Sequence, residues 1–397
     1  MRRPTPSRAA LPAALLALTL VGCGDDDDPV RSPATDEGGP VAGTLPGDAS
    51  EERSRAVAAL GRRMYEDTDL STPPTVSCAT CHSPDAGFAD PRGGPVSAGA
   101  VEGLFGERNA PSVAYAAFVP PLRFATVVEE GGEVEGDYLG GLFLDGRADS
   151  LEIQALAPIR NHLEQNEDSD EAIVAALAAA DYAPEIERLF GEGTLADTGR
   201  ALAALAGSIA AFERTAAVSP FSSRFDAHLA GETDALSEEE LAGLALFDDP
   251  DKGNCSACHT LSPDDPDAPV LFTDHSYDNL GIPRNEANPF LDLPPEANPN
   301  GRAHVDLGLL RTTARAEDAG RFRVPTLRNV ELTAPYGHNG FFATLEDVVR
   351  FYNVKNDGSF GPPEVPETEN REEIGALGLS AEEEAAIVAF LKTLTDR

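Results

Sequence analysis

Tryptophan is absent from the sequence, and methionine occurs only as Met1 and Met64. Lysine is nearly absent too, since Lys252, Lys355 and Lys392 are the only three in 397 residues. Acidic residues outnumber basic ones by 68 to 30, so the formal net charge is −38. A surface of this sign repels nucleic acid and anionic lipid headgroups, and we expect neither as an electrostatic partner.

Long hydrophobic runs are missing as well. The longest, residues 9–21, falls short of the ~20 residues that a membrane-spanning helix needs. It follows a basic start and ends in Leu20-Val21-Gly22-Cys23, which resembles a bacterial lipoprotein signal with Cys23 as the lipidated residue. An ordinary cleaved signal peptide with a stray cysteine is the alternative. Both interpretations place the protein outside the cytoplasm, and we expect a periplasmic protein that contacts a membrane only through a lipid on Cys23.

The predicted signal peptide, residues 1–23, is followed by a polar segment. Residues 24–50 contain the run from Asp25 to Asp28, many prolines and glycines, and no apolar periodicity. A segment of this composition cannot bury enough apolar surface to offset the entropy lost on ordering. We therefore predict a disordered linker that lifts the folded part away from the membrane.

Four of the five cysteines lie in two C-x-x-C-H pentapeptides. In such a pentapeptide the thiols can form thioethers with haem vinyl groups, and the histidine can bind the haem iron. The alternatives are disulfides or a zinc ribbon, whose cysteine pairs usually lie about 15–20 residues apart. Here more than a domain's length of chain separates the pairs, and neither alternative explains a histidine after both. We therefore predict two covalent haem c groups, held by Cys78, Cys81 and His82 and by Cys255, Cys258 and His259.

The stretches that precede the two pentapeptides resemble each other. Residues 55–67 and 238–250 both carry a helical pattern in which a glycine is followed by an aromatic residue and then an aspartate at the same spacing. This repeat indicates a duplicated unit, and the chain is long enough for two domains. We predict a mainly α protein with two cytochrome c-like haem domains, residues 51–235 and 236–397, connected by long loops.

Two of the predicted helices begin with a capping box. Ser237 with Glu240 opens the helix before the second pentapeptide, and Ser380 with Glu383 opens the C-terminal helix. Residues 200–217 carry another clear helical pattern, whereas strand signals are few and weak. These signals favour the mainly α fold class.

Several further stretches are typical of one protein family. They are GERNAPSV at residues 106–113, DGRADSLEIQALAPI at 145–159 and VPTLRNVELTAPYGHNGFFATLEDVVRFY at 324–352. With the two haem motifs, they resemble the bacterial di-haem cytochrome c peroxidases, including the MauG-type enzymes, from about Ala59 to the C-terminus. In that family the N-terminal haem binds peroxide, and the C-terminal haem stores or relays an electron.

The resemblance implies a peroxide site beside the first haem. Gln154 and Glu164 match a glutamine and a glutamate of the family, with Pro158 between them. Cleavage of the O–O bond needs a base that takes the proton from the iron-bound oxygen and returns it to the departing one. Glu164 is expected to do this, while Gln154 orients the peroxide. Without the family, Glu164 would be one exposed acid among 68, and His162 is expected to be a supporting or surface residue.

The resemblance also implies an open first iron. Many members of the family close this iron with a histidine in the loop after the first motif. No histidine lies between His82 and His162 in this chain. We therefore expect a five-coordinate first haem at rest, without a gate that opens on reduction.

The second haem is expected to have an unusual second ligand. Peroxidases of the family use a methionine there, but neither methionine of this chain is near that place. Tyr352 occupies the matching position, as in MauG-type enzymes, and a tyrosinate would stabilise ferric iron. The alternative is a core tyrosine on an apolar helix face, with His338 or His304 as the iron ligand.

The family binds calcium between its haems through an asparagine side chain and two backbone carbonyls. Asn109, Thr333 and Pro335 match these positions, and oxygen ligands suit calcium. Members of the family also have a tryptophan that bridges the haems, where this chain has Leu144. Its neighbour Phe143 is a poor substitute, so hole hopping through a tryptophan is not expected here.

We predict a di-haem peroxidase that reduces hydrogen peroxide to water at the N-terminal haem. Its electrons would pass through the C-terminal haem from a small cytochrome c or cupredoxin. One alternative is MauG-like oxidation of a partner protein, which Tyr352 favours and Leu144 opposes. Another is a di-haem electron carrier, which would need neither Gln154 nor Glu164. Because the family often dimerises, a homodimer is open as well.

Overall fold

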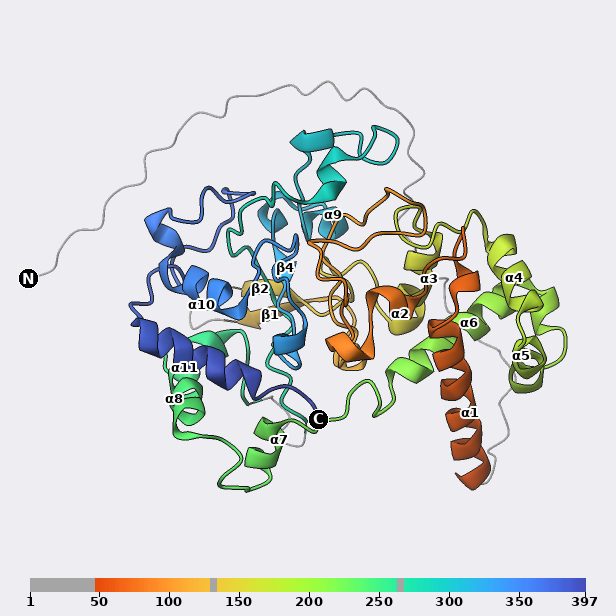
Figure 1. Ribbon diagram of the computed structural model, residues 1–397, viewed down its shortest axis with the longest axis horizontal. Coiled ribbons are helices and arrows are strands. Elements are labelled where there is room, and N and C mark those ends of the chain that lie inside the picture. The colour runs from red at the N-terminus through yellow and green to blue at the C-terminus, as the bar shows by residue number, and fades with distance from the viewer. Residues whose placement is uncertain (1–46, 129–133, 263–267) are drawn as a thin grey trace, which may run out of the picture. The chain divides into compact units, whose positions relative to one another are not determined.

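The computed structural model describes residues 47–128, 134–262 and 268–397, and helices supply most of its regular structure (Figure 1). This content confirms the predicted mainly α fold class. No helix in these ranges is long and apolar enough to cross a bilayer. The α-helices are α1 Gly47–Tyr65, α2 Cys78–Cys81, α3 Leu151–Arg160, α4 Asp170–Ala179, α5 Ala183–Phe190, α6 Thr198–Glu213, α7 Arg224–Leu229, α8 Glu238–Asp248, α9 Leu310–Thr313, α10 Leu345–Val354 and α11 Ala381–Lys392.

Two short antiparallel pairs of strands accompany these helices. β1 (Arg123–Val128) pairs with β2 (Val134–Leu139). β3 (Tyr277–Asp278) pairs with β4 (Phe322–Arg323). The second pair brings together two segments that are distant in the sequence, and both contribute to the wall of the cavity described below.

Close helix crossings explain the repeated glycines. α1 packs on α6, and a Cβ built on Gly61 would lie 1.7 Å from the Ser208 carbonyl oxygen. α8 packs on α11, and a Cβ built on Gly243 would lie 1.9 Å from the Ala386 carbonyl oxygen. Only a residue without a Cβ lets the helix backbones approach this closely. The two halves therefore use the same kind of crossing, and Figure 1 shows both helix pairs.

Buried apolar side chains form one large cluster around each helix pair. The cluster at α1 and α6 includes Leu60 and Met64, which are fully buried. The cluster at α8 and α11 includes Phe247 and Phe390. Phe225 of α7 belongs to this second cluster, although it precedes the predicted domain boundary at residue 235. Removal of these side chains from water is the main favourable term that holds each half together.

The start of α1 corrects the predicted linker. The helix begins at Gly47, so the prediction of disorder for residues 24–50 is wrong for the last four of them. The rest of the linker, the signal segment and Cys23 lie outside the described residues.

The other helix predictions hold with small shifts. Both predicted capping boxes, at Ser237 and Ser380, are present. The helix expected at residues 200–217 ends at Glu213, because the N–H of Thr215 turns back to the Phe212 carbonyl at 2.9 Å.

Candidate functional site

The first C-x-x-C-H motif starts on the short helix α2. Its N-terminus is fixed by Ser77, whose N–H donates to the Thr80 hydroxyl at 2.9 Å. His82 follows the helix directly, and its N–H donates to the Cys78 carbonyl at 2.9 Å. The His82 ring has Nδ1 3.2 Å from the Phe88 carbonyl oxygen. A backbone partner at Nδ1 orients the ring and leaves Nε2 free to bind iron.

The second motif has the same arrangement on a different turn. Cys255–Ala257 form a 3-10 turn that is entered through Asn254 with φ 52°. The His259 ring has Nδ1 2.8 Å from the Phe272 carbonyl oxygen, so its Nε2 is again the free nitrogen. Burial lowers the pKa of both motif histidines, which favours the neutral ring that iron ligation requires.

The motif cysteines are suited to thioether formation rather than to a zinc site. All four are free, half-buried thiols. Burial is the main reason that the pKa of Cys78 and of Cys255 rises to about 12, so both thiols are neutral in the protein without a cofactor. Within the described ranges no group of three or more His, Cys, Asp or Glu side chains converges as a metal site.

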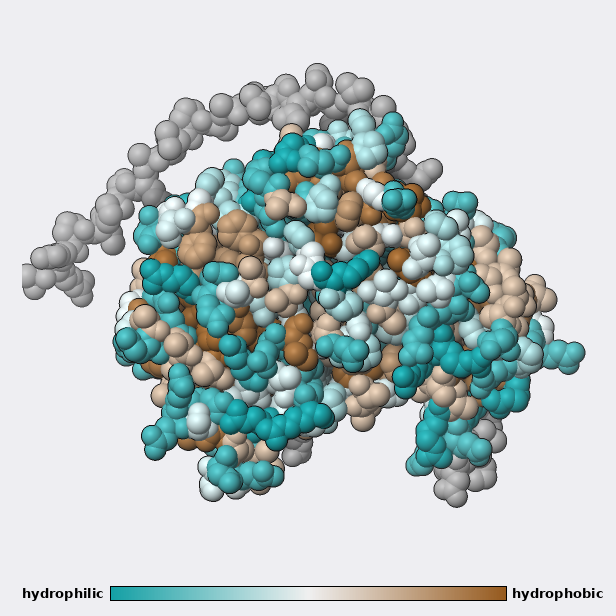
Figure 2. All heavy atoms as spheres, in the orientation of Figure 1, coloured by the Kyte–Doolittle hydropathy of each residue, from teal (hydrophilic) through white to brown (hydrophobic). Residues whose placement is uncertain are grey.

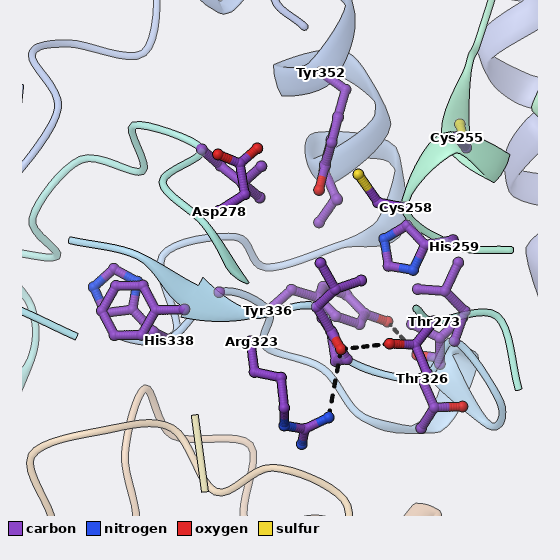
Figure 3. A pocket seen from close by; sticks show the side chains of 18 of the residues that line it. Cys255, Cys258, His259, Thr273, Asp278, Arg323, Thr326, Tyr336, His338 and Tyr352 are labelled. Carbon is purple, nitrogen blue, oxygen red and sulfur yellow. Dashed lines mark hydrogen bonds between the residues drawn. The ribbon is translucent and has the colours of Figure 1, made fainter. Parts of the chain in front are cut away.

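A cavity of about 320 Å³ adjoins the second motif (Figure 3). Cys255, Cys258 and His259 line it together with Tyr352 of α10, and most of the remaining wall is aliphatic or aromatic. An apolar wall with a few placed polar groups is the usual environment of a bound cofactor. The thiols, the free imidazole nitrogen and the apolar wall therefore fit a haem c.

Tyr352 is placed to act as a second ligand in this cavity. Figure 3 shows its side chain projecting into the same space that Cys258 and His259 face. Burial, helped by the neighbouring thiols, raises the pKa of Tyr352 far above its ordinary value. The phenol is therefore neutral unless a cation such as ferric iron stabilises its anion. The geometry agrees with ligation by Tyr352, which stays a prediction.

The two rival histidines are engaged elsewhere. His338 lines the cavity, but its Nε2 lies 3.2 Å from Glu364 and its ring stacks on Phe322 with centroids 4.0 Å apart. His304 is not among the residues that line this cavity, and its Nε2 lies 2.8 Å from Glu107. Tyr352 is therefore better placed than either histidine.

The predicted catalytic pair lies in and just after α3. Gln154 is inside this helix, and the Glu164 carboxylate beyond its end accepts a hydrogen bond from Asn161 Nδ2 at 2.8 Å. Burial raises the pKa of Glu164, although Arg147 and Asn161 act in the opposite direction. The next residue, Gln165, donates from its Nε2 to Cys78 Sγ at 3.6 Å, so the segment that carries Glu164 lies beside the first motif. The structure thus places a carboxyl group with a perturbed pKa beside the first motif.

The three predicted calcium ligands border one cavity although they are distant in the sequence. Asn109, Thr333 and Pro335 all line the same cavity. The backbone N–H of Asn109 donates to the His338 carbonyl at 2.8 Å, and its side-chain Nδ2 donates to the Pro95 carbonyl at 3.1 Å. Within the described part of the chain no hydrogen bond reaches the Asn109 Oδ1, so this oxygen could bind a cation. Calcium at this place stays a prediction.

Two cavity residues were missed by the sequence analysis. Among the described residues, the Arg323 side chain donates only to carbonyl oxygens, those of Phe143 at 3.3 Å and Val324 at 3.4 Å, and burial lowers its pKa. Such a guanidinium could pair with a haem propionate. His275 has φ 60°, and its buried Nδ1 finds no partner in the described ranges. Burial, followed by the charge of Arg323, lowers the pKa of His275 to about 4. The only signal in the sequence was that Arg323 directly precedes the family stretch at residues 324–352.

Comparisons with known proteins find similar di-haem proteins. Residues 55–234 match the family model of the di-haem cytochrome c peroxidases. The chain is 38% identical over 383 residues to the methylamine utilization protein MauG of Paracoccus denitrificans, which covers 90% of this chain and 94% of that protein. It is 30% identical over 349 residues to the cytochrome-c peroxidase IdrP1 of Denitromonas iodatirespirans, with 85% and 81% covered. Among solved structures, the di-haem peroxidase BthA from Burkholderia thailandensis matches with a TM-score of 0.72 and 33% identity over 86% of each chain.

Proposed function

Because the chain belongs to the family of di-haem cytochrome c peroxidases, which includes the MauG proteins, we propose that it reduces hydrogen peroxide to water at the first haem with electrons that arrive through the second. It is an oxidoreductase of the peroxidase type, and the family's cofactor is haem c. The observation that carries the proposal is the position of Glu164. Its carboxyl group has a raised pKa and is held by Asn161, and the next residue, Gln165, reaches Cys78 Sγ of the first C-x-x-C-H motif at 3.6 Å.

Glu164 moves a proton in the proposed reaction. A haem on the first motif would supply the iron that binds peroxide and takes up its oxidising equivalents. Glu164 takes the proton from the oxygen nearer the iron and gives it to the departing oxygen, which leaves as water. Gln154 orients the peroxide from α3, and Asn161 holds the carboxylate in place. With two electrons and two protons from outside, each peroxide yields two waters.

Tyr352 and His259 define the electron-transfer side of the proposal. They face the same cavity, and these two residues would hold the iron of a haem bound there. With both ligands in place such a haem would have no position for peroxide, so the chemistry that it would supply is electron storage and relay. A tyrosinate stabilises ferric iron and lowers the reduction potential of such a haem.

Oxidation of a partner protein is the second candidate function. The observation that favours it is the position of Tyr352 in the cavity, together with 38% identity to MauG of Paracoccus denitrificans. In this case peroxide would be consumed at the same first haem, but the electrons would come from side chains of the partner. A small redox protein would then not support turnover.

The test of the proposed function is steady-state peroxide consumption with a reduced small cytochrome c or cupredoxin. The wild-type protein should oxidise two donor molecules per peroxide. Glu164→Gln keeps the shape of the side chain but cannot take the proton, so we expect turnover to fall by about 10²–10⁴-fold.

Glu152→Gln is the matched control for this variant. Glu152 lies on α3 and is paired with Arg214 at 2.7 Å on the surface, where such an ion pair contributes only about 0–1 kcal/mol. Turnover should be unchanged in this control. If Glu164→Gln turns over like Glu152→Gln, Glu164 is not the catalytic base.

The donor, the location and the calcium ion are further parts of the proposal. The net charge of −38 would steer a basic donor protein toward this chain, and hydrophilic residues cover much of the face in Figure 2. We place the protein in the periplasm, tethered by a lipid on Cys23. A calcium ion held by Asn109, Thr333 and Pro335 would tie the two haem sites together.

A further inference from the structure

The position that carries the bridging tryptophan in the family is occupied by Leu144, which lies on the wall of the second motif's cavity. A leucine cannot be oxidised at potentials that a haem reaches. If electrons pass between the haems by hopping, another aromatic side chain must lie between the two motifs. Tyr115 is such a residue, and it is 2% exposed.

One side of Tyr115 is connected to the first motif. The segment that carries it begins with Val113, whose N–H donates to the Phe88 carbonyl at 3.1 Å. The same carbonyl lies 3.2 Å from Nδ1 of His82. Val113 and His82 therefore share the Phe88 carbonyl as a partner, and Tyr115 is two residues beyond Val113 in the chain.

The other side of Tyr115 is connected to the second motif. Tyr115 lines the cavity that Cys255 and His259 also line. The guanidinium of Arg328 lies 5.1 Å from the Tyr115 ring and 6.0 Å from the Phe272 ring. The Phe272 carbonyl is the one that orients His259. A short chain of contacts thus runs from the back of one iron-binding histidine to the back of the other.

Tyr115 also has a built-in proton acceptor. Its hydroxyl donates to the Asp396 carboxylate at 2.6 Å. Loss of an electron makes a phenol strongly acidic, so a neutral tyrosine can be oxidised easily only if its proton has somewhere to go. The N–H of Phe221 donates to the same hydroxyl oxygen at 3.1 Å, so this oxygen keeps a partner after the proton has moved.

We propose that Tyr115 is the redox-active residue that relays electrons between the two haems, in place of the absent tryptophan. The inference rests on the proposed peroxidase function, since hydrogen peroxide is the oxidant. Tyr115 gives one electron to the peroxide-oxidised first haem, and its hydroxyl proton passes to Asp396. The neutral radical then takes one electron from the second haem, and Asp396 returns the proton. No atom is lost, and one electron moves from the second haem to the first.

The other tyrosines near the first motif lack one of these features. Tyr65 donates to the His82 carbonyl at 2.7 Å, and a carbonyl oxygen cannot take up the proton. Tyr182 has an aspartate partner, with its hydroxyl 2.5 Å from Asp67, but is not among the residues that line the second motif's cavity. Tyr182 is also buried and has an arginine near its ring, so it shares the burial, the carboxylate partner and the nearby arginine of Tyr115.

The experiment compares Tyr115→Phe with Tyr182→Phe. The protein with both haems reduced is mixed with one equivalent of peroxide in a stopped-flow instrument, and each haem is followed at its own absorption bands. In the wild type both haems should become oxidised, and the second-haem phase should slow in deuterated water. In Tyr115→Phe we expect an unchanged first-haem phase and a second-haem phase slowed by about tenfold or more, without its isotope effect. Tyr182→Phe should behave like the wild type.

Asp396→Asn is the second variant. It keeps a hydrogen-bond acceptor for the Tyr115 hydroxyl but removes the proton acceptor, so the second-haem phase should slow here too. If Tyr115→Phe does not fold, Asp396→Asn still tests whether the Tyr115–Asp396 pair relays electrons. A purely structural role for the Tyr115–Asp396 pair would lower the melting temperature of the variants and leave the second-haem phase unchanged.

The outcomes separate the relay from the peroxidase function. An unchanged second-haem phase in a folded Tyr115→Phe or Asp396→Asn protein would overturn the relay. An equal slowing in Tyr182→Phe would overturn it as well. If peroxide fails to oxidise the first haem of the wild type, the proposed peroxidase function itself is wrong.

Discussion

Replacement of Gly61 by alanine tests whether the helix crossing of the first half supports the haem site. A Cβ at this position would lie 1.7 Å from the Ser208 carbonyl oxygen and 2.3 Å from its carbon. Real contacts of this kind are rarely below 3.0 Å, so α1 and α6 would have to separate by more than 1 Å. Overpacking of this kind costs about 1–3 kcal/mol, and a backbone contact belongs at the upper end. Alanine regains about 1 kcal/mol of helix propensity, so we expect a net loss of about 2 kcal/mol in the free energy of unfolding.

The same change should reach the first haem motif. α1 ends at Tyr65, whose hydroxyl donates to the His82 carbonyl at 2.7 Å. The assay is urea denaturation of the holo-protein, followed by circular dichroism and by haem absorption. Gly207→Ala is the matched control, because a Cβ at this α6 position meets nothing within 4 Å. We expect this control to gain about 0.5–1 kcal/mol. A Gly61→Ala protein as stable as the control would refute the account of the crossing.

Three further predictions concern the cofactors and the catalytic base. A pyridine haemochrome assay should show two covalent haems per chain, and one after Cys78 and Cys81 are both changed to alanine; zinc without a Soret band would contradict the haem sites. Glu164 must be deprotonated to act as a base, and burial raises its pKa. On acidification the rate of peroxide cleavage should therefore begin to fall at a higher pH than it would for a carboxylate with an ordinary pKa. A pH–rate profile that keeps this limb in Glu164→Gln would assign it to another group. Removal of calcium with a chelator should disturb the spectra of both haems, because Asn109 and the segment around Thr333 come from different halves; unchanged spectra and turnover would argue against the site.

Short-range patterns were predictable because their physical cause is local. The capping boxes at Ser237 and Ser380 are hydrogen bonds between residues three positions apart, and both are present. The C-x-x-C-H motifs needed only their own spacing, and their histidines are oriented alike in the structure. The predicted linker was four residues too long at its C-terminal end. Its composition, rich in glycine and aspartate, favours disorder, but the helix that follows continues back to Gly47.

Long-range contacts were not predictable in this way. Arg323 reaches the cavity because β4 pairs with β3, and two-residue strands leave almost no pattern in a sequence. Tyr115 meets Asp396 across 281 positions of the chain. Arg323 directly precedes one family stretch and Tyr115 follows another by two residues, but neither position shows what the side chain contacts. Their roles depend on which segments the fold brings together.

The central claim is that the first iron is open to peroxide and the second is closed by Tyr352. Electron paramagnetic resonance of the oxidised protein at rest tests this claim most directly. It should show one high-spin ferric signal from the first haem and one low-spin signal from the second, and Tyr352→Phe should change only the low-spin signal. Two low-spin signals at rest, or a low-spin signal that is unaffected in Tyr352→Phe, would contradict the account.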